Sequence, residues 1–431
     1  MAEPPPKKRI VIIGGGIIGW TTAYYLTRHP QYNPSLHTIH LVEATGIASG
    51  ASGKAGGLLA LWAYPACLVP LSFRLHAELA AEHDGAQRWG YRGVGVGQIE
   101  LLGRKVGEGG EKGVNSSVEA RSAGASGGEN ADMDLGTVSL QKRSAESYAR
   151  LRKAGLPDDL DWVAEECVRA YDSMGSPDDT AQVHPYQFTT SMAQLAEEKG
   201  LKVILGTVDE VLDADDRPEA LHTVKYTDKE ANERHSLPAT DVIITAGPWT
   251  PTILPSAPIG SLRAHSVTIR PSHPVSAYCL FTSLSLPKNY KTGTKSRATT
   301  VTPEIYARPN NELYACGEGD HLVPLPKSTA EVQVDPSRCQ DIVDYCASFS
   351  DEMRDGEVLV RQACYLPQVE RGSGAPLIGL TGRKGVYLAA GHTCWGIQNA
   401  PATGKVVSEF VFDGKSVSAE VRSLDPRRVL R

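Results

Sequence analysis

The chain has 431 residues, enough for two or three domains, and its 44 Lys and Arg against 50 Asp and Glu give a formal net charge of −6. This mildly acidic balance argues against nucleic-acid binding, which depends on Lys and Arg neutralising phosphates. No apolar run approaches the roughly 18 residues of a membrane span, the N-terminus lacks the apolar core of a secretory signal, and the eight cysteines form no CxxC pair. We therefore expect a cytoplasmic protein with reduced thiols, no membrane span, no metal site and no nucleic-acid partner. The oligomeric state stays open.

The first elements form a predicted strand–helix–strand unit. Residues 9–13 are a short apolar run rich in Ile and Val, typical of a strand buried on both faces. The glycine-rich turn 14–19 follows, and 17–28 is compatible with a helix. A second predicted strand, 38–42, leads into Glu43, so this region forms one βαβ unit.

The glycine-rich turn carries the pattern GxGxxG in the context that favours dinucleotide binding. Gly14 permits the tight turn, Gly16 lets the backbone approach a diphosphate, and Gly19 lets the helix pack closely on the strand. The diphosphate is expected at the start of the helix, where free N–H groups favour negative charge. Glu43 lies 24 residues beyond Gly19, near the spacing of a ribose-binding acid, and an acid there disfavours NADP. The alternative is a merely structural turn.

A long loop of small residues, 45–57, follows the acid. Its Ser49, Ser52 and Lys54 could bring hydroxyls, backbone N–H groups and one cation against a second part of the cofactor. The alternative is a flexible surface loop.

Later segments repeat the pattern of strands and helices and predict an α/β fold. A helix is expected at 185–198, and a terminal helix at about 402–412. Predicted strands cover 201–205, 207–212, 241–245 and 385–390. Three strands that end in glycine turns so far apart indicate one domain assembled from separated segments.

Two further segments differ from this pattern. Residues 103–136 are dense in Gly, Ser, Glu and Asn and predict a disordered, dispensable insertion, because they cannot offset their ordering entropy by burial. Between 261 and 360, alternating runs such as 264–270 and 312–316 predict an antiparallel sheet in a second domain.

Four ordered motifs resemble the FAD-dependent D-amino-acid oxidase-like superfamily, which includes glycine oxidase and sarcosine oxidase. They are the βαβ unit with its small-residue loop, VHP at 183–185, AGPW at 246–249, and GHTCWGI at 391–397 followed by APATGK at 400–405. They span residues 10 to 405, nearly the whole chain apart from the insertion, and the overall pattern is similar to fungal members of the group.

The resemblance implies a discontinuous, Rossmann-like FAD-binding domain made of residues 1–98, 141–262 and 361–431. A mainly antiparallel substrate domain, 99–102 and 263–360, would cover the flavin, with 103–140 as the insertion. The helix from Thr403 would point its N-terminus toward the flavin ring and stabilise negative charge there. The cofactor-binding residues that we expect are Gly14, Gly16, Ile17, Ile18, Gly19, Glu43, Ala44, Ser49, Ser52, Gly53, Lys54, Ala55, Gly56, Gly57, Leu58, Val208, Ala246, Gly247, Trp249, Gly391, His392, Gly396, Ile397 and Gln398.

The sequence also departs from the family pattern at two positions. Glycine oxidases carry an Arg, which helps to hold the substrate carboxylate, where this chain has Cys394. Sarcosine oxidases carry a Lys that aligns roughly with Gln398 and promotes the reaction with oxygen. Both departures argue against glycine or sarcosine as the substrate and against an efficient oxygen reaction.

The candidate catalytic residues implied by the resemblance are His392, Tyr365 and Gln398. His392 could instead be a hydrogen-bonded core histidine, and Tyr365 a core tyrosine on a strand. Some relatives attach the flavin covalently to a cysteine in the stretch that contains Cys364, but a free cysteine is usually a small buried apolar residue, so we expect non-covalent FAD.

The activity that the resemblance implies is oxidation of the C–N bond of an amine or amino acid. Hydride would pass to flavin N5, the imine would be hydrolysed, and the electrons would go to oxygen or another acceptor. The alternative is a flavin-binding protein with a regulatory or trafficking role and weak or lost turnover.

Overall fold

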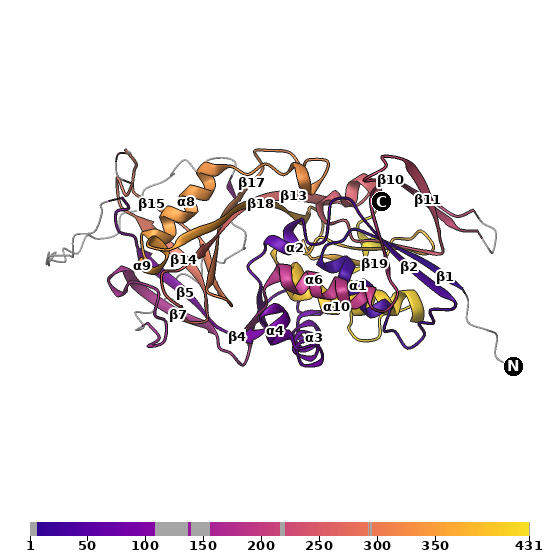
Figure 1. Cartoon of the computed structure of the whole chain (residues 1–431), viewed down its shortest axis with the longest axis horizontal. Helices are drawn as coiled ribbons and strands as arrows, with labels where there is room; N and C mark the ends of the chain where they lie inside the picture. The colour runs from indigo at the N-terminus through magenta and orange to yellow at the C-terminus, as the bar shows by residue number, and fades with distance from the viewer. Residues whose placement is uncertain are drawn as a thin grey trace.

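The computed structural model describes residues 7–107, 137–138, 156–215, 220–291, 293 and 295–430, with only the backbone of 137–138. Most of the predicted insertion, 103–140, lies outside these residues. Figure 1 shows two sheet systems side by side along the long axis of the molecule.

Among the described residues, an eight-stranded sheet has the order β11-β10-β9-β2-β1-β12-β20-β19. Its parallel centre consists of β9, β2, β1, β12 and β20, and β10, β11 and β19 add antiparallel edges. The bounds are β1 (Lys8–Ile13), β2 (His37–Glu43), β9 (Lys202–Leu212), β10 (His222–Asp228), β11 (Arg234–Ala239), β12 (Asp241–Ile244), β19 (Leu377–Leu380) and β20 (Val386–Ala390). The predicted parallel sheet built from separated segments is confirmed.

The side chains of strand β1 show that both faces of this sheet are covered by apolar clusters. Ile10 and Ile12 face the cluster that contains Trp20 of α1 (Ile17–Leu26), whereas Val11 and Ile13 face the opposite cluster. All four side chains are at most 3% exposed. Replacing any of them by alanine removes apolar contacts and costs about 2–5 kcal/mol of unfolding free energy.

Several helices cover the first of these faces. They are α1, α3 (Val69–Glu82), α6 (Pro185–Glu197) and α10 (Gly396–Asp413), with α4 (Gly85–Trp89) beside them. Figure 1 shows α1, α6 and α10 together on this side of the sheet. The short helices α2 (Ala51–Lys54) and α7 (Thr250–Ile253) lie in the loops after β2 and β12.

A second, nine-stranded sheet within the described residues is mostly antiparallel, with the path β18-β13-β17-β16-β14-β5-β7 and β15 and β6 attached to it. The antiparallel sheet expected between 261 and 360 is confirmed. Its strands are β5 (Gly95–Leu102), β6 (Thr137–Val138), β7 (Val168–Gly175), β13 (Ile259–Arg270), β14 (Tyr278–Leu286), β15 (Thr299–Val301), β16 (Glu304–Arg308), β17 (Glu312–Asp320) and β18 (Glu357–Val369). A third small sheet joins β3 (Leu58–Ala60), β8 (Thr180–Gln182) and β4 (Arg92–Gly93).

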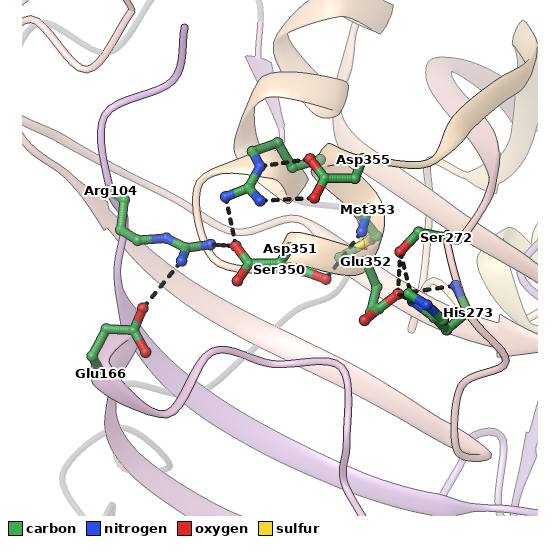
Figure 2. Close-up of polar contacts among 10 residues, drawn as sticks. Arg104, Glu166, Ser272, His273, Ser350, Asp351, Glu352, Met353 and Asp355 are labelled. Carbon is green, nitrogen blue, oxygen red and sulfur yellow. Dashed lines mark hydrogen bonds and ion pairs between the residues drawn. The ribbon is translucent and has the colours of Figure 1, made fainter. Parts of the chain in front are cut away.

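Helices α8 (Pro336–Ala347) and α9 (Asp351–Arg354) pack on the nine-stranded sheet. Figure 2 shows how polar contacts join α9 to neighbouring segments: Arg104 donates to Glu166 Oε1 over 3.0 Å and to Asp351 Oδ1 over 2.5 Å. In the same view Ser272 and His273 contact the carboxylate of Glu352. Each of these exposed pairs contributes about 0–1 kcal/mol to the free energy of unfolding. Most of the stability therefore comes from the apolar core.

Three expectations are corrected by the structure. The two strands predicted at 201–205 and 207–212 are one strand, β9, because Gly206 stays in the ladder. Strand β7 pairs with β5 of the second sheet, although it falls in a segment that we assigned to the FAD-binding domain. The terminal helix begins at Gly396, before the predicted start near residue 402, and contains Pro401. The domain boundaries themselves stay a prediction.

Candidate active site

The glycine-rich turn has the geometry that each of its glycines predicts. Gly14 has φ +109°, and a Cβ there would lie 2.6 Å from the carbonyl oxygen of Thr245. A Cβ on Gly19 would lie 2.0 Å from the carbonyl oxygen of Gly14, so only glycine lets α1 approach the turn this closely. Gly16 precedes α1 and provides no side-chain cap. The N–H of Ile17 donates to Ser52 Oγ, and the other N–H groups of the first turn, which have no partner within the helix, suit an anionic group.

Glu43 closes the turn from the end of β2. Its Oε2 accepts a hydrogen bond from the N–H of Gly15 over 2.7 Å. Its Oε1 accepts from the N–H groups of Thr45 over 2.8 Å and Gly46 over 3.2 Å. The carboxylate is thus held at the point where a cofactor ribose would lie beside the turn.

The small-residue loop is hydrogen-bonded to helix α1 and to the second sheet. Ser52 Oγ accepts from the N–H of Ile17, the first residue of α1, over 2.9 Å. Lys54 Nζ donates to the carbonyl oxygen of Ala363 on β18 over 2.9 Å. The guanidinium of Arg308 donates to the carbonyl of Ala55 and, over 2.6 Å, to Glu312. The sequence analysis missed Arg308, whose side chain is almost fully buried.

A single elongated cavity joins the glycine-rich turn to the inner face of the second sheet. Its 50 lining residues include 22 of the predicted site residues. The predicted residues that line it are Gly14, Gly16, Ile17, Ile18, Glu43, Ala44, Ser49, Ser52, Lys54, Ala55, Gly56, Gly57, Leu58, Val208, Ala246, Gly247, Trp249, Tyr365, Gly391, His392, Gly396 and Ile397. Gly19, Gly53 and Gln398 do not line it.

The prediction that Gln398 lines the site is wrong, because its side chain does not reach the cavity. It is fully buried, and its Oε1 accepts from the N–H of Ala60 on β3 over 2.7 Å. The terminal helix was also expected to start at Thr403. It starts instead at Gly396, and its first two residues, Gly396 and Ile397, line the cavity. The N-terminus of this helix therefore does face the cavity, but with different residues.

His392 combines a cavity-lining position with a structural hydrogen bond. Its Nε2 lies 3.1 Å from Thr403 Oγ1, and that hydroxyl donates to the carbonyl of Asn399 over 2.8 Å. Because the hydroxyl proton is committed to Asn399, Nε2 is the protonated nitrogen of His392. Burial lowers the pKa of His392 to about 3, so the ring is neutral at physiological pH.

Tyr365 and Cys364 lie next to one another on β18 at the cavity wall. The hydroxyl of Tyr365 donates to the carbonyls of Val323 and Pro324 over 2.9 and 3.0 Å. Burial raises the pKa of the Cys364 thiol to about 11, although the charge of Lys54 opposes that shift. The thiol is therefore protonated at neutral pH and is a weak nucleophile.

The sequence analysis missed the side of the cavity formed by the second sheet. Glu304, Tyr306, Tyr314 and Cys316 line it from β16 and β17. Alternation along these strands was the only signal available, and it does not show which sheet face meets a cavity. A further segment, 321–331, was also missed: Pro326 accepts from Trp249 Nε1 over 2.7 Å.

These residues fit FAD. The left-handed Gly14, the Gly16 without a side chain in front of α1 and the acid held beside them suit a nucleotide diphosphate and ribose. The same cavity then continues past Gly56 and Gly57 to the mainly apolar and aromatic wall around Trp395, where a flat ring system can lie. The residues that would hold the ring are those of 391–397.

Comparison with known proteins agrees with this fit. The family described as FAD dependent oxidoreductase (DAO) matches residues 9–410, and the chain belongs to it. The family uses FAD, so the cofactor and the oxidoreductase class expected from the motifs are confirmed.

Individual relatives extend the comparison. The chain is 36% identical to the protein named "Putative oxidoreductase TDA3" of Saccharomyces cerevisiae, over 95% of this chain and 92% of that one. Its fold is similar to glycine oxidase from Geobacillus kaustophilus, with a TM-score of 0.65 at 17% identity, covering 98% of this chain and 99% of that chain. It is also similar to L-proline dehydrogenase from P. horikoshii, with a TM-score of 0.64 at 16% identity, covering 99% and 98%.

Two further findings bear on the expectations about partners. No helix in the described ranges is long and apolar enough to cross a membrane. Within those same ranges, no group of three or more His, Cys, Asp or Glu side chains is arranged to hold a metal ion.

Proposed function

We propose that this protein oxidises the C–N bond of an amine or amino acid to an imine, which water then hydrolyses. The observation that carries the proposal is the continuous cavity from the glycine-rich turn to a wall of aromatic side chains on the second sheet. FAD, when bound, supplies the two-electron acceptor. The similar folds named glycine oxidase and L-proline dehydrogenase support this reaction class.

The protein's own contribution is to position the substrate and exclude water. Trp395 is buried at the cavity wall, with Trp62 packed edge-on against it at a ring distance of 5.6 Å. Cys394, at the position of the glycine oxidase arginine, presents no cation to a carboxylate, and burial raises the pKa of its thiol to about 12. These residues support as substrate an amine that is bulkier or less acidic than glycine and sarcosine.

Each of the three candidate catalytic side chains has a polar atom hydrogen-bonded to a protein group, although Gln398 Nε2 is buried without a hydrogen-bond partner. His392 is bonded to Thr403, Tyr365 to backbone carbonyls, and Gln398 to Ala60. The chemistry that we propose needs no acid–base residue if the amine binds in its neutral form. The same observation also supports the second candidate, a flavin-binding protein with a regulatory or trafficking role and weak or lost turnover.

The test is the visible spectrum of the purified protein under anaerobic conditions, before and after addition of amines. We expect a flavin spectrum that a larger secondary or aromatic amine bleaches faster than glycine or sarcosine does. Faster bleaching by glycine or sarcosine would refute the substrate proposal. A flavin that no amine bleaches would favour the second candidate. Peroxide formation compared with dye reduction then identifies oxygen or another acceptor.

A further inference from the structure

Glu304 places a carboxyl group in the wall of the cavity, on the side formed by the second sheet. It is the first residue of β16 and pairs in register with Cys316 of β17 and Phe281 of β14. The residue is only 7% exposed, yet it lines the cavity. A buried acid in a ligand cavity is costly unless hydrogen bonds or charges compensate it, and Glu304 has such contacts.

Tyr306 belongs to the same arrangement. It lies two residues further along β16, on the same face of the strand, and its hydroxyl donates to Glu304 Oε2 over 2.5 Å. A Cβ built on Gly56 would lie 2.8 Å from the Tyr306 ring. The Glu304–Tyr306 pair therefore lies where the small-residue loop of the cofactor site meets the second sheet.

Aromatic rings surround this pair. Tyr314 and Trp395 also line the cavity, and the rings of Tyr306 and Tyr314 are 5.7 Å apart. Aromatic faces together with a carboxylate form the environment that proteins use to bind ammonium groups. These four lining residues offer no cation to a carboxylate ligand, and the guanidinium of Arg308, which lies over the Tyr314 ring, is paired with Glu312.

Charges of both signs lie at this end: Glu304 lines the cavity, and the guanidinium of Arg308, outside the lining, lies 4.6 Å from the Tyr314 ring and pairs with Glu312. Burial first, and then the charge of Glu304, raises the pKa of both Cys316 and Cys394. In the part of the chain that the structure describes, the lysines that line the cavity are Lys54 and Lys327. Lys54 donates to the carbonyl of Ala363. Lys327 follows Pro326, whose carbonyl accepts a hydrogen bond from Trp249 Nε1.

We propose that the Glu304 carboxylate, oriented by Tyr306, binds the ammonium group of the substrate and takes one proton from it, so that the amine is neutral before hydride leaves its α-carbon, and that the substrate carries no carboxylate next to its nitrogen. This inference rests on the proposed amine oxidation and narrows it to alkyl or arylalkyl amines. Glu304 sets specificity by charge: it attracts a cationic amine into the cavity and repels an amino acid whose carboxylate would lie against it.

Binding of inert probes tests this without turnover. Benzyltrimethylammonium, benzyl alcohol and benzoate share one ring and differ in charge, and each is titrated into the flavin-loaded protein by calorimetry and by the flavin difference spectrum. We expect the cation to bind at least tenfold more tightly than the alcohol, and benzoate to bind most weakly. Benzoate binding as tightly as the cation would overturn the proposal.

Variants then assign the effect to Glu304. Glu304→Gln should weaken binding of the cation at least tenfold and change binding of the alcohol less than threefold. Tyr306→Phe, which keeps the ring, should have a smaller effect of the same sign. Glu100→Gln, on β5 of the same sheet and outside the cavity lining, is the matched control and should change neither. An unchanged affinity of Glu304→Gln for the cation would refute the role of Glu304.

The outcomes separate this inference from the proposed function. If Glu304→Gln fails to fold or loses flavin, the charge series on the unaltered protein still decides the question. Cation binding that depends on Glu304 without bleaching by any amine would support the site and contradict the oxidation. Bleaching by an amino acid, with no preference for the cationic probe, would support the oxidation and contradict the site.

Discussion

His76 Nε2 donates a hydrogen bond to the backbone carbonyl of Ile397 over 3.0 Å, linking α3 to the first turn of α10. Pro401, four residues after Ile397, has no N–H to offer this carbonyl, so the helix alone would leave it unsatisfied. His76 is completely buried, and its ring packs against Phe188 of α6. A side chain from a distant helix thus completes the end of α10 that lines the cavity.

Replacing this donor should destabilise the protein. We expect His76→Phe, which keeps a ring against Phe188, to lower the free energy of unfolding by about 1–3 kcal/mol, because it leaves a buried carbonyl without a partner. Urea denaturation measures the change. Pro401→Ala restores an N–H that can reach Ile397, so His76→Phe should cost clearly less in the Pro401→Ala background. Equal costs in both backgrounds would show that the hydrogen bond is not the reason.

Buried neutral histidines should make the protein less stable in mild acid. Burial lowers the pKa of His76 and His265 to about 4 and of His392 to about 3. Since the unfolded chain titrates near the ordinary value of about 6.5, it binds more protons than the folded protein between these values. The contribution of these histidines to the free energy of unfolding is therefore fully present above about pH 6.5, and it is lost as the pH falls toward 4 and then 3.

The comparison of variants isolates this effect from that of the carboxylates. His392→Gln should reduce the loss of unfolding free energy between pH 7 and pH 5, as measured by urea denaturation at both values. His273→Gln, at a largely exposed histidine, should leave that loss unchanged. A His392→Gln protein as acid-sensitive as the unaltered chain would contradict the assignment.

The close approach of α1 to the glycine-rich turn should depend on Gly19. Gly19→Ala puts a Cβ 2.0 Å from the carbonyl oxygen of Gly14, so the helix must shift. We expect a cost of about 1–3 kcal/mol and loss of most of the bound flavin, measured by the ratio of visible to ultraviolet absorbance. Gly46→Ala, where a Cβ meets nothing within 4 Å, should retain both stability and flavin. Equal flavin content in the two variants would contradict this role for Gly19.

The flavin should be bound without a covalent link. Burial raises the pKa of the Cys364 thiol to about 11, which leaves little thiolate to attack a flavin. Acid precipitation should release the yellow colour to the supernatant, and Cys364→Ser should behave in the same way. Colour that stays in the pellet of the unaltered protein, but not of Cys364→Ser, would identify a covalent bond at this cysteine.

Local sequence was enough to predict the nucleotide half of the site. The strand at β1, the glycines at the turn and the helix α1 follow one another within about 20 residues, and each has a preference that needs no distant partner. Glu43 could be placed because β2 runs parallel to β1 and ends at the same edge of the sheet. Local sequence preferences also predicted helix α6 and strand β12 to within a residue or two.

The substrate half was decided by tertiary structure. The first turn of α10 is hydrogen-bonded to His76, and Gln398 is held by Ala60. Strand β7 joins the second sheet through its pairing with β5. All of these partners are distant in sequence. The sequence analysis singled out neither Glu304 nor Tyr306, and only the packing of the nine-stranded sheet against the loop at Gly56 showed that their shared strand face meets the cavity. Periodicity reports which residues lie on one side of an element, whereas the neighbour on that side is set by long-range packing.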